Sequence, residues 1–495
     1  MSRTKENQAK GMPEGVCPHN EICGGCCYQG VSYEEQLKNK EGEARGFFHE
    51  SGVIPEKFDA IEGCPEEYRY QYRNKMEYTF GDLVKDGPLQ LGMHKKRQFM
   101  SVVTVDQCQL VHPDFNKILR YTLDFCEERG YKKYHKKLHT GLLRNLIIRR
   151  GVRTHELLVS IVTSTESEFD AQSWKDGLLD LPLENTIVGI SQTLNDVLAD
   201  KVSCDKLINL YGRDYYMEEI FGLKLRVNLF SFFQTNVEAV ERLYREAIDL
   251  IDDFHGKRVF DLYCGTGTIS QVMAKEAASV LGVEIVPESV EAAKANAELN
   301  GLTNCEFLCG DVFKVLETRS DKPDVIVVDP PRAGMSPDAV NKIAAYGVSQ
   351  IVYISCNPKT LARDLSGFKY LGYDVKYVKP FDNFPMTKHV ETVAVLSRKS
   401  ATKTFIPVTV SPKDMGLDEA KAQPTYENIR KYVKETHGLT VSTLNIAQMK
   451  AECGLEMECD RSGGKQQPKC PSEKREAILD AFRHFGMIED DSSEG

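Results

Sequence analysis

The sequence predicts an α/β protein in which a doubly wound parallel sheet follows a β-rich domain and precedes a small helical appendage. Three observations predict this architecture. Strand and helix patterns alternate after Phe221, short alternating strands dominate before it, and helical spacing returns after a stretch poor in large apolar residues. We therefore expect domains at 15–220, 221–398 and 425–490, because one hydrophobic core rarely serves a chain of 495 residues.

Composition excludes several classes of protein. The net charge of -10 argues against a uniformly basic nucleic-acid coat, although a local basic surface remains compatible with it. No apolar run approaches the roughly 20 residues that span a bilayer, and the polar N-terminus lacks a signal-peptide core. We expect a cytoplasmic protein with no membrane association, in which the fifteen cysteines serve metal binding or catalysis rather than disulfides.

Cysteines gather near the N-terminus, at Cys17, Cys23, Cys26 and Cys27, and Cys108 is a further candidate. Two glycines between Cys23 and Cys26 let the backbone fold tightly. Four thiolates hold either an iron–sulfur cluster or a tetrahedral zinc ion, and the spacing leaves the metal open. Cys27 is expected to be structural, because it is adjacent to Cys26 and points elsewhere. The alternative is a set of unligated thiols.

Two segments of the β-rich domain have the composition of an RNA-binding surface. Residues 68–75 mix aromatic and cationic side chains, which suits bases and phosphates or, alternatively, a solvated strand edge. Between Arg129 and His155 the chain has no Asp or Glu. We expect an electrostatic footprint there, on antiparallel strands near 146–150 and 156–162. Its cations are Lys132, Lys133, Lys136, Lys137, Arg144, Arg149, Arg150 and Arg153.

The doubly wound sheet is predicted from a regular succession of elements after a helix that begins at Val237. Its apolar residues recur with helical spacing up to Leu250. Seven short apolar strands follow, separated by loops or helical stretches. They cover 259–262, 280–284, 305–309, 324–329, 351–354, 375–378 and 390–396.

The first of these strands enters a glycine turn, Gly265-Thr-Gly267, and then a helix. Ser270 occupies the position of the third small residue of the dinucleotide fingerprint. With Asp261 before the turn and Glu284 at the end of the next strand, an S-adenosylmethionine site fits better than a pyrophosphate site. Glu284 lies at the distance from the turn at which a carboxylate meets ribose hydroxyls.

The fifth strand ends abruptly in Ser355-Cys356-Asn357-Pro358. Ligands collect at the carboxyl ends of parallel strands, so Cys356 is a candidate nucleophile. The alternative is a structural thiol, because free cysteine is among the most buried residue types. Asp329 opens the neighbouring loop, in which two prolines fix the backbone before Arg332. Arg332 either contacts RNA phosphate or braces its loop.

Taken together, these motifs resemble the S-adenosylmethionine-dependent RNA uracil-C5 methyltransferases, in the branch that carries an iron–sulfur cluster and modifies 23S ribosomal RNA. The resemblance runs from Cys17 to Leu396 and implies a Rossmann-like methyltransferase domain. It assigns a [4Fe-4S] cluster to Cys17, Cys23, Cys26 and Cys108. It also matches the motifs around Cys356 and His389-Val-Glu391-Thr, and places cofactor and active-site contacts at Gln234, Tyr263, Glu284 and Asp329, with Thr268 and Asp311.

The chemistry implied by the resemblance needs a thiol and a carboxylate. Cys356 adds to carbon 6 of a flipped uracil, carbon 5 takes the methyl group, and Glu391 removes the proton from carbon 5. We expect a polar, partly electropositive environment around the Cys356 thiol. The alternatives are a tRNA uridine-C5 methyltransferase, a cytosine-C5 methyltransferase and a non-catalytic iron–sulfur RNA-binding protein. The cytosine enzymes place a cysteine in or near their proline motif, whereas the Asp329 loop has none.

Two features depart from the resemblance. Many relatives begin with a small β-barrel that binds RNA, whereas sixteen residues precede Cys17, so we expect that domain to be missing. The appendage after Arg398 also lies outside the resemblance. It contains Cys453, Cys459 and Cys470, which are not expected to form a second metal site without a clear fourth thiol. We expect a monomer.

Overall fold

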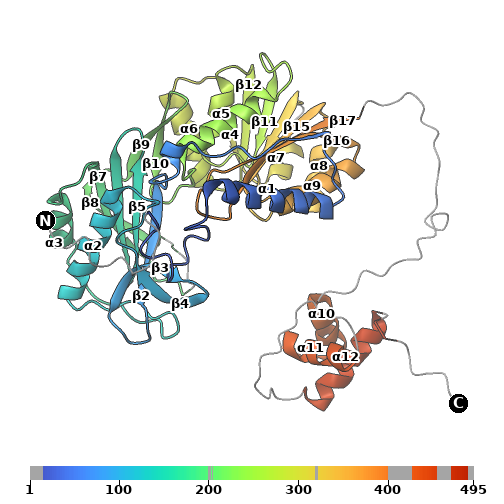
Figure 1. The fold of residues 1–495 in the computed structure, drawn as a ribbon. Coiled ribbons are helices and arrows are strands. Elements are labelled where there is room, and N and C mark those ends of the chain that lie inside the picture. Colours follow the sequence, from blue (N-terminus) through green and yellow to red (C-terminus); the bar gives the residue numbers. More distant parts are fainter. Residues whose placement is uncertain are drawn as a thin grey trace, which may run out of the picture. The chain divides into compact units, whose positions relative to one another are not determined.

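The computed structural model describes residues 15–198, 202, 204–317, 321–399, 426–453, 470–485 and 487–488. The chain divides into two compact units, with the division after Ser400. The first unit contains two large sheets, and the second is helical (Figure 1).

The sheet of the C-terminal half has eight strands in the order β1-β16-β17-β15-β14-β11-β12-β13. Strands β11 to β15 pair in parallel, and β17 runs antiparallel between β15 and β16. The predicted doubly wound α/β architecture is therefore confirmed. The strands are β1 (Lys57–Phe58), β11 (Arg258–Leu262), β12 (Ser279–Glu284), β13 (Cys305–Cys309), β14 (Val325–Val328), β15 (Gln350–Ser355), β16 (Tyr373–Phe381) and β17 (Glu391–Arg398).

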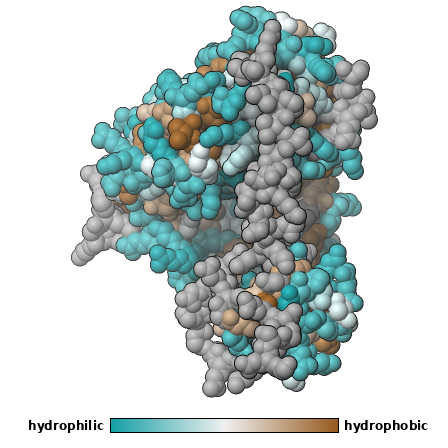
Figure 2. All heavy atoms as spheres, turned by 90° about the vertical axis from the view of Figure 1, so that its right-hand side faces the viewer, coloured by the Kyte–Doolittle hydropathy of each residue, from teal (hydrophilic) through white to brown (hydrophobic). Residues whose placement is uncertain are grey.

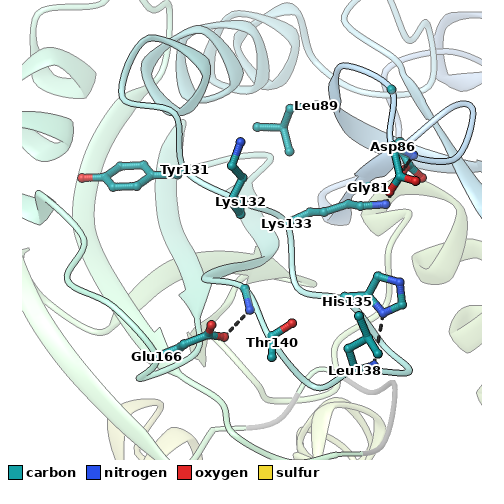
Figure 3. A pocket seen from close by; sticks show the side chains of 13 residues that line it. Gly81, Asp86, Leu89, Tyr131, Lys132, Lys133, His135, Leu138, Thr140 and Glu166 are labelled. Carbon is teal, nitrogen blue, oxygen red and sulfur yellow. Dashed lines mark hydrogen bonds and ion pairs between the residues drawn. The ribbon is translucent and has the colours of Figure 1, made fainter.

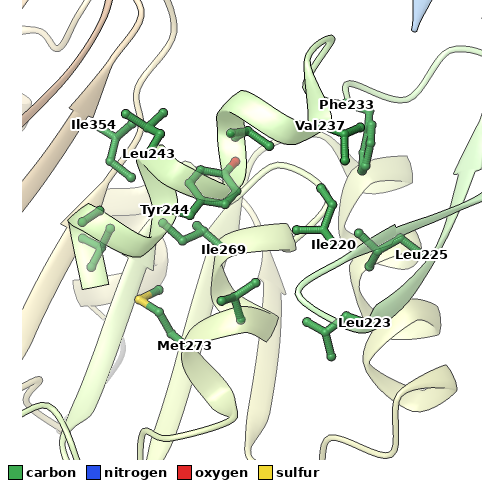
Figure 4. Close-up of a cluster of buried hydrophobic side chains, with 14 of the residues drawn as sticks. Ile220, Leu223, Leu225, Phe233, Val237, Leu243, Tyr244, Ile269, Met273 and Ile354 are labelled. Carbon is green, nitrogen blue, oxygen red and sulfur yellow. The ribbon is translucent and has the colours of Figure 1, made fainter. Parts of the chain in front are cut away.

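Helices cover both faces of this sheet because successive side chains of each strand point to opposite faces. In β14, Val325 and Val327 pack in one hydrophobic cluster, and Ile326 and Val328 pack in the other. Figure 4 shows part of the first cluster, where Leu243 lies beside Ile354 of β15 and Tyr244 lies beside Ile269. The helices are α1 (Tyr33–Glu50), α4 (Val237–Asp249), α5 (Thr268–Ala274), α6 (Pro287–Leu299), α7 (Val312–Glu317), α8 (Pro337–Ala345) and α9 (Pro358–Tyr370).

An N-terminal segment completes this sheet. Strand β1 pairs in parallel with β16, and α1 packs against α9 (Figure 1). Lys40 of α1 forms a 2.6 Å ion pair with Asp382, and both side chains are inaccessible to solvent. Residues 33–58 lie in the range expected for the β-rich domain, yet they pack with the sheet of 221–398. A strand of two residues leaves too little pattern for a sequence to indicate this.

The β-rich part contains a seven-stranded sheet in the order β4-β3-β2-β5-β6-β7-β8. Strands β6 and β7 pair in parallel, which corrects the expectation of a purely antiparallel domain, because α3 provides the crossover between them. The elements are η1 (Glu66–Tyr68), β2 (Lys75–Asp82), β3 (Leu89–Lys95), β4 (Gln98–Thr104), α2 (Pro113–Glu128), β5 (Leu143–Gly151), β6 (Glu156–Thr163), α3 (Ala171–Leu179), β7 (Thr186–Leu194) and β8 (Lys206–Gly212), followed by the hairpin β9 (Tyr215–Ile220) and β10 (Leu223–Asn228).

The second unit consists, in its described part, of α10 (Tyr426–His437), α11 (Thr443–Glu452) and α12 (Ser472–His484). Ile429, Ile446 and Phe482, one from each helix, share a buried core. The small appendage predicted at 425–490 is therefore helical in its described part. Cys459 lies outside the described residues, as do 400–425 of the expected linker.

Hydrophilic residues cover most of the described surface seen in Figure 2, with small hydrophobic areas between them. Among the described residues, no helix combines the length and apolar character that a membrane span requires.

Candidate active site at the ends of β14, β15 and β17

The predicted nucleophile and base come from neighbouring antiparallel strands. Cys356 directly follows β15, and Glu391 is the first residue of β17. Ser355 pairs with Thr392, so Cys356 and Glu391 both lie at this end of the β15–β17 pair, and Glu391 is close enough to raise the pKa of the Cys356 thiol. The thiol is half-buried and the carboxyl is 4% exposed. The fold therefore brings together two residues that lie 35 positions apart in the sequence.

The loop after β14 joins this pair. Val328 pairs with Tyr353, so Asp329 emerges beside the end of β15. The Asn357 side-chain amide donates to the Arg332 carbonyl at 3.1 Å, and its oxygen accepts the Lys359 N–H at 3.2 Å as the cap of α9. One side chain thus caps the helix after the nucleophile and braces the loop after Asp329.

Burial and mutual repulsion set the protonation of the site. Burial raises the pKa of Glu391 to about 7, and the Arg332 charge opposes the shift. Burial and the nearby Glu391 raise the pKa of Asp329 to about 8. The pKa of Cys356 is raised to about 11 by burial first, then by Glu391 and Asp329, while Arg332 lowers it.

Lys40, Lys359 and Lys388 line the cavity at Cys356, in keeping with the expected partly electropositive environment, but the two buried carboxyls act against ionisation of the thiol. Arg332 opposes the effect of the carboxyls. Residue types alone do not reveal this, because the sign depends on which charges the fold buries together. The pKa of His389 is lowered to about 4, by burial first and then by Arg332 and Arg73, so its imidazole is neutral at pH 7.

A cavity of about 160 Å³ opens beside Cys356, the predicted nucleophile. Its walls come from α1, the Arg332 loop, the start of α9 and the segment before β17. Cations predominate among the charged residues that line it, which suits an anionic polymer. The charged and titratable lining residues are Lys40, Glu43, Arg332, Cys356, Lys359, Lys388 and His389.

The glycine turn after β11 has a strained backbone. Tyr263, Gly265 and Gly267 all have positive φ, of 68°, 54° and 71°. The conformation is unfavourable for tyrosine, so the surrounding structure must hold it. A Cβ on Gly267 would lie 2.6 Å from the Phe307 ring, which explains why this turn requires glycine. Thr268 begins α5 directly after the turn.

Carboxylates stand at the strand ends beside this turn. The Glu284 carboxylate accepts main-chain N–H groups from Gly265 at 3.1 Å, Ile285 at 2.9 Å and Val286 at 3.0 Å. Asp311 follows β13. The pKa of Tyr263 is raised to about 12, first by burial of its hydroxyl and second by the nearby Asp311 charge. Carboxylates in these positions suit ribose hydroxyls and a sulfonium charge. These residues therefore fit S-adenosylmethionine.

Gln234 approaches the same region from the loop before α4. Its side chain hydrogen-bonds the Tyr244 hydroxyl, whose pKa is raised by burial and by the nearby Asp329. Asn74 of the β-rich domain donates to the Gln234 carbonyl at 2.9 Å. The predicted cofactor residue is thus held from both halves of the unit.

Two further groups belong to this region: Asp261, which the sequence analysis placed before the turn without giving it contacts, and Tyr244. Asp261 is fully buried, accepts a hydrogen bond from Ser270, and has a pKa raised by burial to about 7. Tyr244 was assigned only to the apolar face of its helix. The sequence signal for a role of Asp261 was Ser270, whose hydroxyl replaces the third small residue of the dinucleotide fingerprint and donates a hydrogen bond to Asp261.

Four predicted metal ligands line one small cavity, of about 40 Å³. They are Cys17, Cys23, Cys26 and Cys108. The pKa of Cys26 is raised to about 12, chiefly by burial and also by the other three thiols. A hydrogen bond from Gln29 acts in the opposite direction. Among the described residues, no group of three or more His, Cys, Asp or Glu side chains has the arrangement of a metal-ion site. Cys27 is exposed and lies near the Met386 carbonyl instead.

Of the eight cations in the predicted electrostatic footprint, three are buried and a fourth is held in ion pairs. Arg144, Arg149 and Arg150 of β5 are buried, and Arg153 pairs with Glu238 and Glu241 of α4. This corrects the prediction for those four residues. The physical reason is that the β-rich sheet is covered on both sides at β5, so its cations serve internal contacts. The aromatic segment is also partly internal, because the buried Tyr72 donates to the Pro385 carbonyl at 2.9 Å.

A larger cavity, of about 460 Å³, lies in the β-rich part (Figure 3). Its lining includes Lys132, Lys133 and Leu138, with Glu166 accepting the Gly141 N–H. It contains none of the predicted catalytic or cofactor residues, so its size does not mark the reaction site.

Comparisons with known proteins agree with this geometry. A family model described as a methyltransferase domain matches residues 253–365. A protein described as an uncharacterized RNA methyltransferase from Clostridium acetobutylicum is 44% identical over 389 residues, covering 79% of this chain and 85% of the relative. One from Clostridium tetani is 45% identical over 386 residues, covering 78% and 84%.

A solved structure extends the likeness. The crystal structure of Pyrococcus abyssi tRNA (uracil-54, C5)-methyltransferase in complex with S-adenosyl-L-homocysteine has a TM-score of 0.62 and 27% sequence identity. The match covers 76% of this chain and 84% of that structure.

Proposed function

Because the chain belongs to the RNA uracil-C5 methyltransferase family, we propose that it transfers a methyl group from S-adenosylmethionine to carbon 5 of a uridine in RNA. S-adenosylmethionine-dependent RNA methylation follows from the family. The observation that carries the finer assignment is that Cys356 and Glu391 meet at one end of the β15–β17 pair, where Ser355 pairs with Thr392 and Glu391 raises the pKa of the thiol. A thiol and a carboxyl facing one bound base are what addition at carbon 6 and deprotonation at carbon 5 require.

In the proposed reaction, the Cys356 sulfur loses its proton and forms a bond to carbon 6 of the uracil, which makes carbon 5 nucleophilic. Bound S-adenosylmethionine supplies the electrophilic methyl group. The Glu391 carboxylate then takes the proton from carbon 5, and the carbon–sulfur bond breaks to return the thiolate. A pKa near 7 suits this base, because the carboxylate form is available at neutral pH while its proton affinity is high.

The neighbouring groups support the two covalent steps. Arg332 is the charge that lowers the pKa of both Cys356 and Glu391. It therefore favours both ionised forms. Burial excludes water from the carboxyl pair, which strengthens these electrostatic effects.

We propose 23S ribosomal RNA as the substrate, on the family branch that the cysteine motif resembles. A transfer RNA is the second candidate, favoured by the likeness to the tRNA (uracil-54, C5)-methyltransferase structure. Methylation of unmodified 23S ribosomal RNA and transfer RNA transcripts, followed by mass mapping, separates the two. Labelling confined to transfer RNA would overturn the ribosomal assignment.

We also propose that Cys17, Cys23, Cys26 and Cys108 bind a [4Fe-4S] cluster. The support is that all four line one cavity and influence one another's ionisation. Around one zinc ion, thiolates stand about 3.8 Å apart, whereas a four-iron cluster is larger and holds its cysteines farther apart. The absence of a single-ion arrangement among the described residues is therefore compatible with a cluster.

Iron and sulfide analysis of anaerobically purified protein tests the cluster. The Cys108→Ser variant should lose the iron, whereas Cys27→Ser should keep it, because Cys27 is exposed and adjacent to the ligand set. Stoichiometric zinc without iron would contradict the proposal.

The mechanism is tested with RNA that contains 5-fluorouridine. Fluorine replaces the proton that Glu391 removes, so the methylated base should remain bound to Cys356 in a complex that survives denaturing electrophoresis. Formation should require S-adenosylmethionine. The Cys356→Ala variant should give neither adduct nor product, and the exposed Cys204→Ala control should give both. Methylation by Cys356→Ala, or turnover without any adduct in the wild type, would refute the mechanism.

A further inference from the structure

The turn between β3 and β4 has an unusual residue choice. Lys95 pairs with Gln98, so Lys96 and Arg97 alone form the turn. Arg97 has φ of 59°, a conformation that two-residue hairpin turns usually fill with glycine or asparagine. A long cationic side chain at a left-handed, exposed position serves something other than the turn itself.

An exposed aromatic ring lies beside this turn. Phe99 is 62% exposed and stacks on His94, with ring centroids 4.6 Å apart and planes 22° apart. The Lys136 ammonium lies 4.7 Å from the centre of the same ring. Met100 and Leu138 are also exposed apolar residues of these two segments. Apolar side chains gathered on a surface indicate an interaction site rather than a folding requirement.

The two segments beside Phe99 carry cations but no carboxylates of their own, although Lys133 pairs with Asp82 of β2. Residues 94–100 and 130–141 contain no Asp or Glu, although the whole chain has a net charge of -10. Arg97, Lys132 and Lys137 are exposed. These are the parts of the basic sequence that stay outside, in contrast to the buried arginines of β5.

We infer that Phe99 is a stacking platform for an unpaired base of the substrate RNA, with the exposed Arg97, Lys132 and Lys137 contacting the adjoining phosphates. This inference rests on the proposed function for the identity of the partner. A flat ring held by His94 offers a base a π-face, and the cations beside it match a polyanion. An acidic peptide would match the charge, but it has no use for a rigid, exposed ring.

The segment that holds Cys17, Cys23 and Cys26 lies between the Phe99 platform and the residues around Cys356. The Gly24 N–H donates to the His94 carbonyl at 2.9 Å, and the backbones of Cys23 and Lys95 form an isolated antiparallel β-bridge. Arg73 lines the cysteine cavity and also lowers the pKa of His389, close to the reacting pair. RNA that spans the platform and the cavity at Cys356 would cross this segment, so Phe99 binds a nucleotide away from the target base.

Tryptophan fluorescence tests the inference. The chain has one tryptophan, Trp174, which is fully buried, so Phe99→Trp introduces an exposed reporter. In the full-length protein, a single-stranded RNA oligonucleotide of mixed sequence should quench the new emission and protect it from acrylamide. The matched control is Tyr370→Trp, at an 89%-exposed aromatic position on α9, where RNA should have no such effect.

Binding and turnover supply the second measurement. In fluorescence anisotropy with the same labelled oligonucleotide, Phe99→Ala should lose about 10-fold in affinity, and Phe99→Trp should retain it. Phe99→Ala should raise KM for RNA at unchanged kcat, and Tyr370→Ala should change neither.

Three outcomes would overturn the platform. They are wild-type affinity in Phe99→Ala, Phe99→Trp emission that RNA does not change, and emission that polyglutamate quenches but RNA does not. If 5-fluorouridine RNA gave no adduct while quenching persisted, the uracil-C5 mechanism would fail and the RNA platform would stand. The two proposals therefore fail separately.

Discussion

Replacing Glu391 by Gln should block one step of the reaction and, at the same time, stabilise the fold at high pH. The carboxyl is buried, and its pKa is raised from 4.5 to about 7 by that burial. The folded state therefore holds a proton that the unfolded state has released between these values. Above pH 7 the carboxylate is charged in both states, and the folded protein bears the cost of burying it.

The size of this cost follows from the shift. About 2.5 pKa units correspond to about 3 kcal/mol at pH 8, and the cost falls to about 1.4 kcal/mol at pH 5.5. The amide has no charge at either pH, so the stability gain of Glu391→Gln should shrink by about 2 kcal/mol between pH 8 and pH 5.5. For a unit of this size, with an unfolding entropy of about 0.8 kcal/mol/K, the apparent Tm gain should fall by about 2 °C.

Differential scanning fluorimetry of Glu391→Gln and wild type at the two pH values measures this difference. Glu298→Gln on the exposed side of α6 is the matched control and should show no pH-dependent gain. With ordinary uridine RNA, Glu391→Gln should accumulate the Cys356 adduct and lose about 10²- to 10⁴-fold in turnover. A gain that is equal at both pH values, or normal turnover, would refute the assignment of Glu391 as a buried base.

Three other substitutions test the surroundings of the pair. Asp382→Asn leaves the buried Lys40 without its counter-charge, so urea unfolding should show a loss of about 3–5 kcal/mol, and an unchanged midpoint would contradict the pairing. Asn357→Ala removes the brace on the Arg332 carbonyl and the cap of α9, so single-turnover methylation should slow about 10-fold and stability should fall by about 1 kcal/mol. Arg332→Gln removes the charge that lowers the pKa of Cys356, so the pH at which the 5-fluorouridine adduct forms should rise, whereas an unshifted profile would exclude that role.

Much of the catalytic half could be predicted from sequence, because its chemistry lies at strand ends. Cys356 follows an apolar run at the carboxyl end of β15, and the carboxyl ends of parallel strands meet at one edge of the sheet, whereas Glu391 stands at the amino end of β17. Their mutual register could not be predicted, since it depends on β17 entering between β15 and β16 in the antiparallel sense.

The burial of cations could not be predicted either. Arg149 lies in an alternating strand and looks like part of a basic surface, yet it is fully buried and donates to the Ser231 carbonyl. The partner lies 82 positions away, so no local pattern reveals it. The same limit applies to α1, whose buried Lys40 finds its counter-charge 342 positions further along the chain.

The segment between β16 and β17 links the cysteine cavity to the reacting pair. Met386 has φ of 67°, which is unfavourable for a side chain of this kind and costs about 1 kcal/mol. Its carbonyl accepts the N–H groups of Cys27 at 3.0 Å and Tyr28 at 3.2 Å, and its own N–H donates to Gln36 at 3.0 Å. The cysteine segment and α1 therefore hold the strained residue from two directions. Since Glu391 follows five positions later, these hydrogen bonds tie the cysteine segment and α1 to the backbone that leads into Glu391.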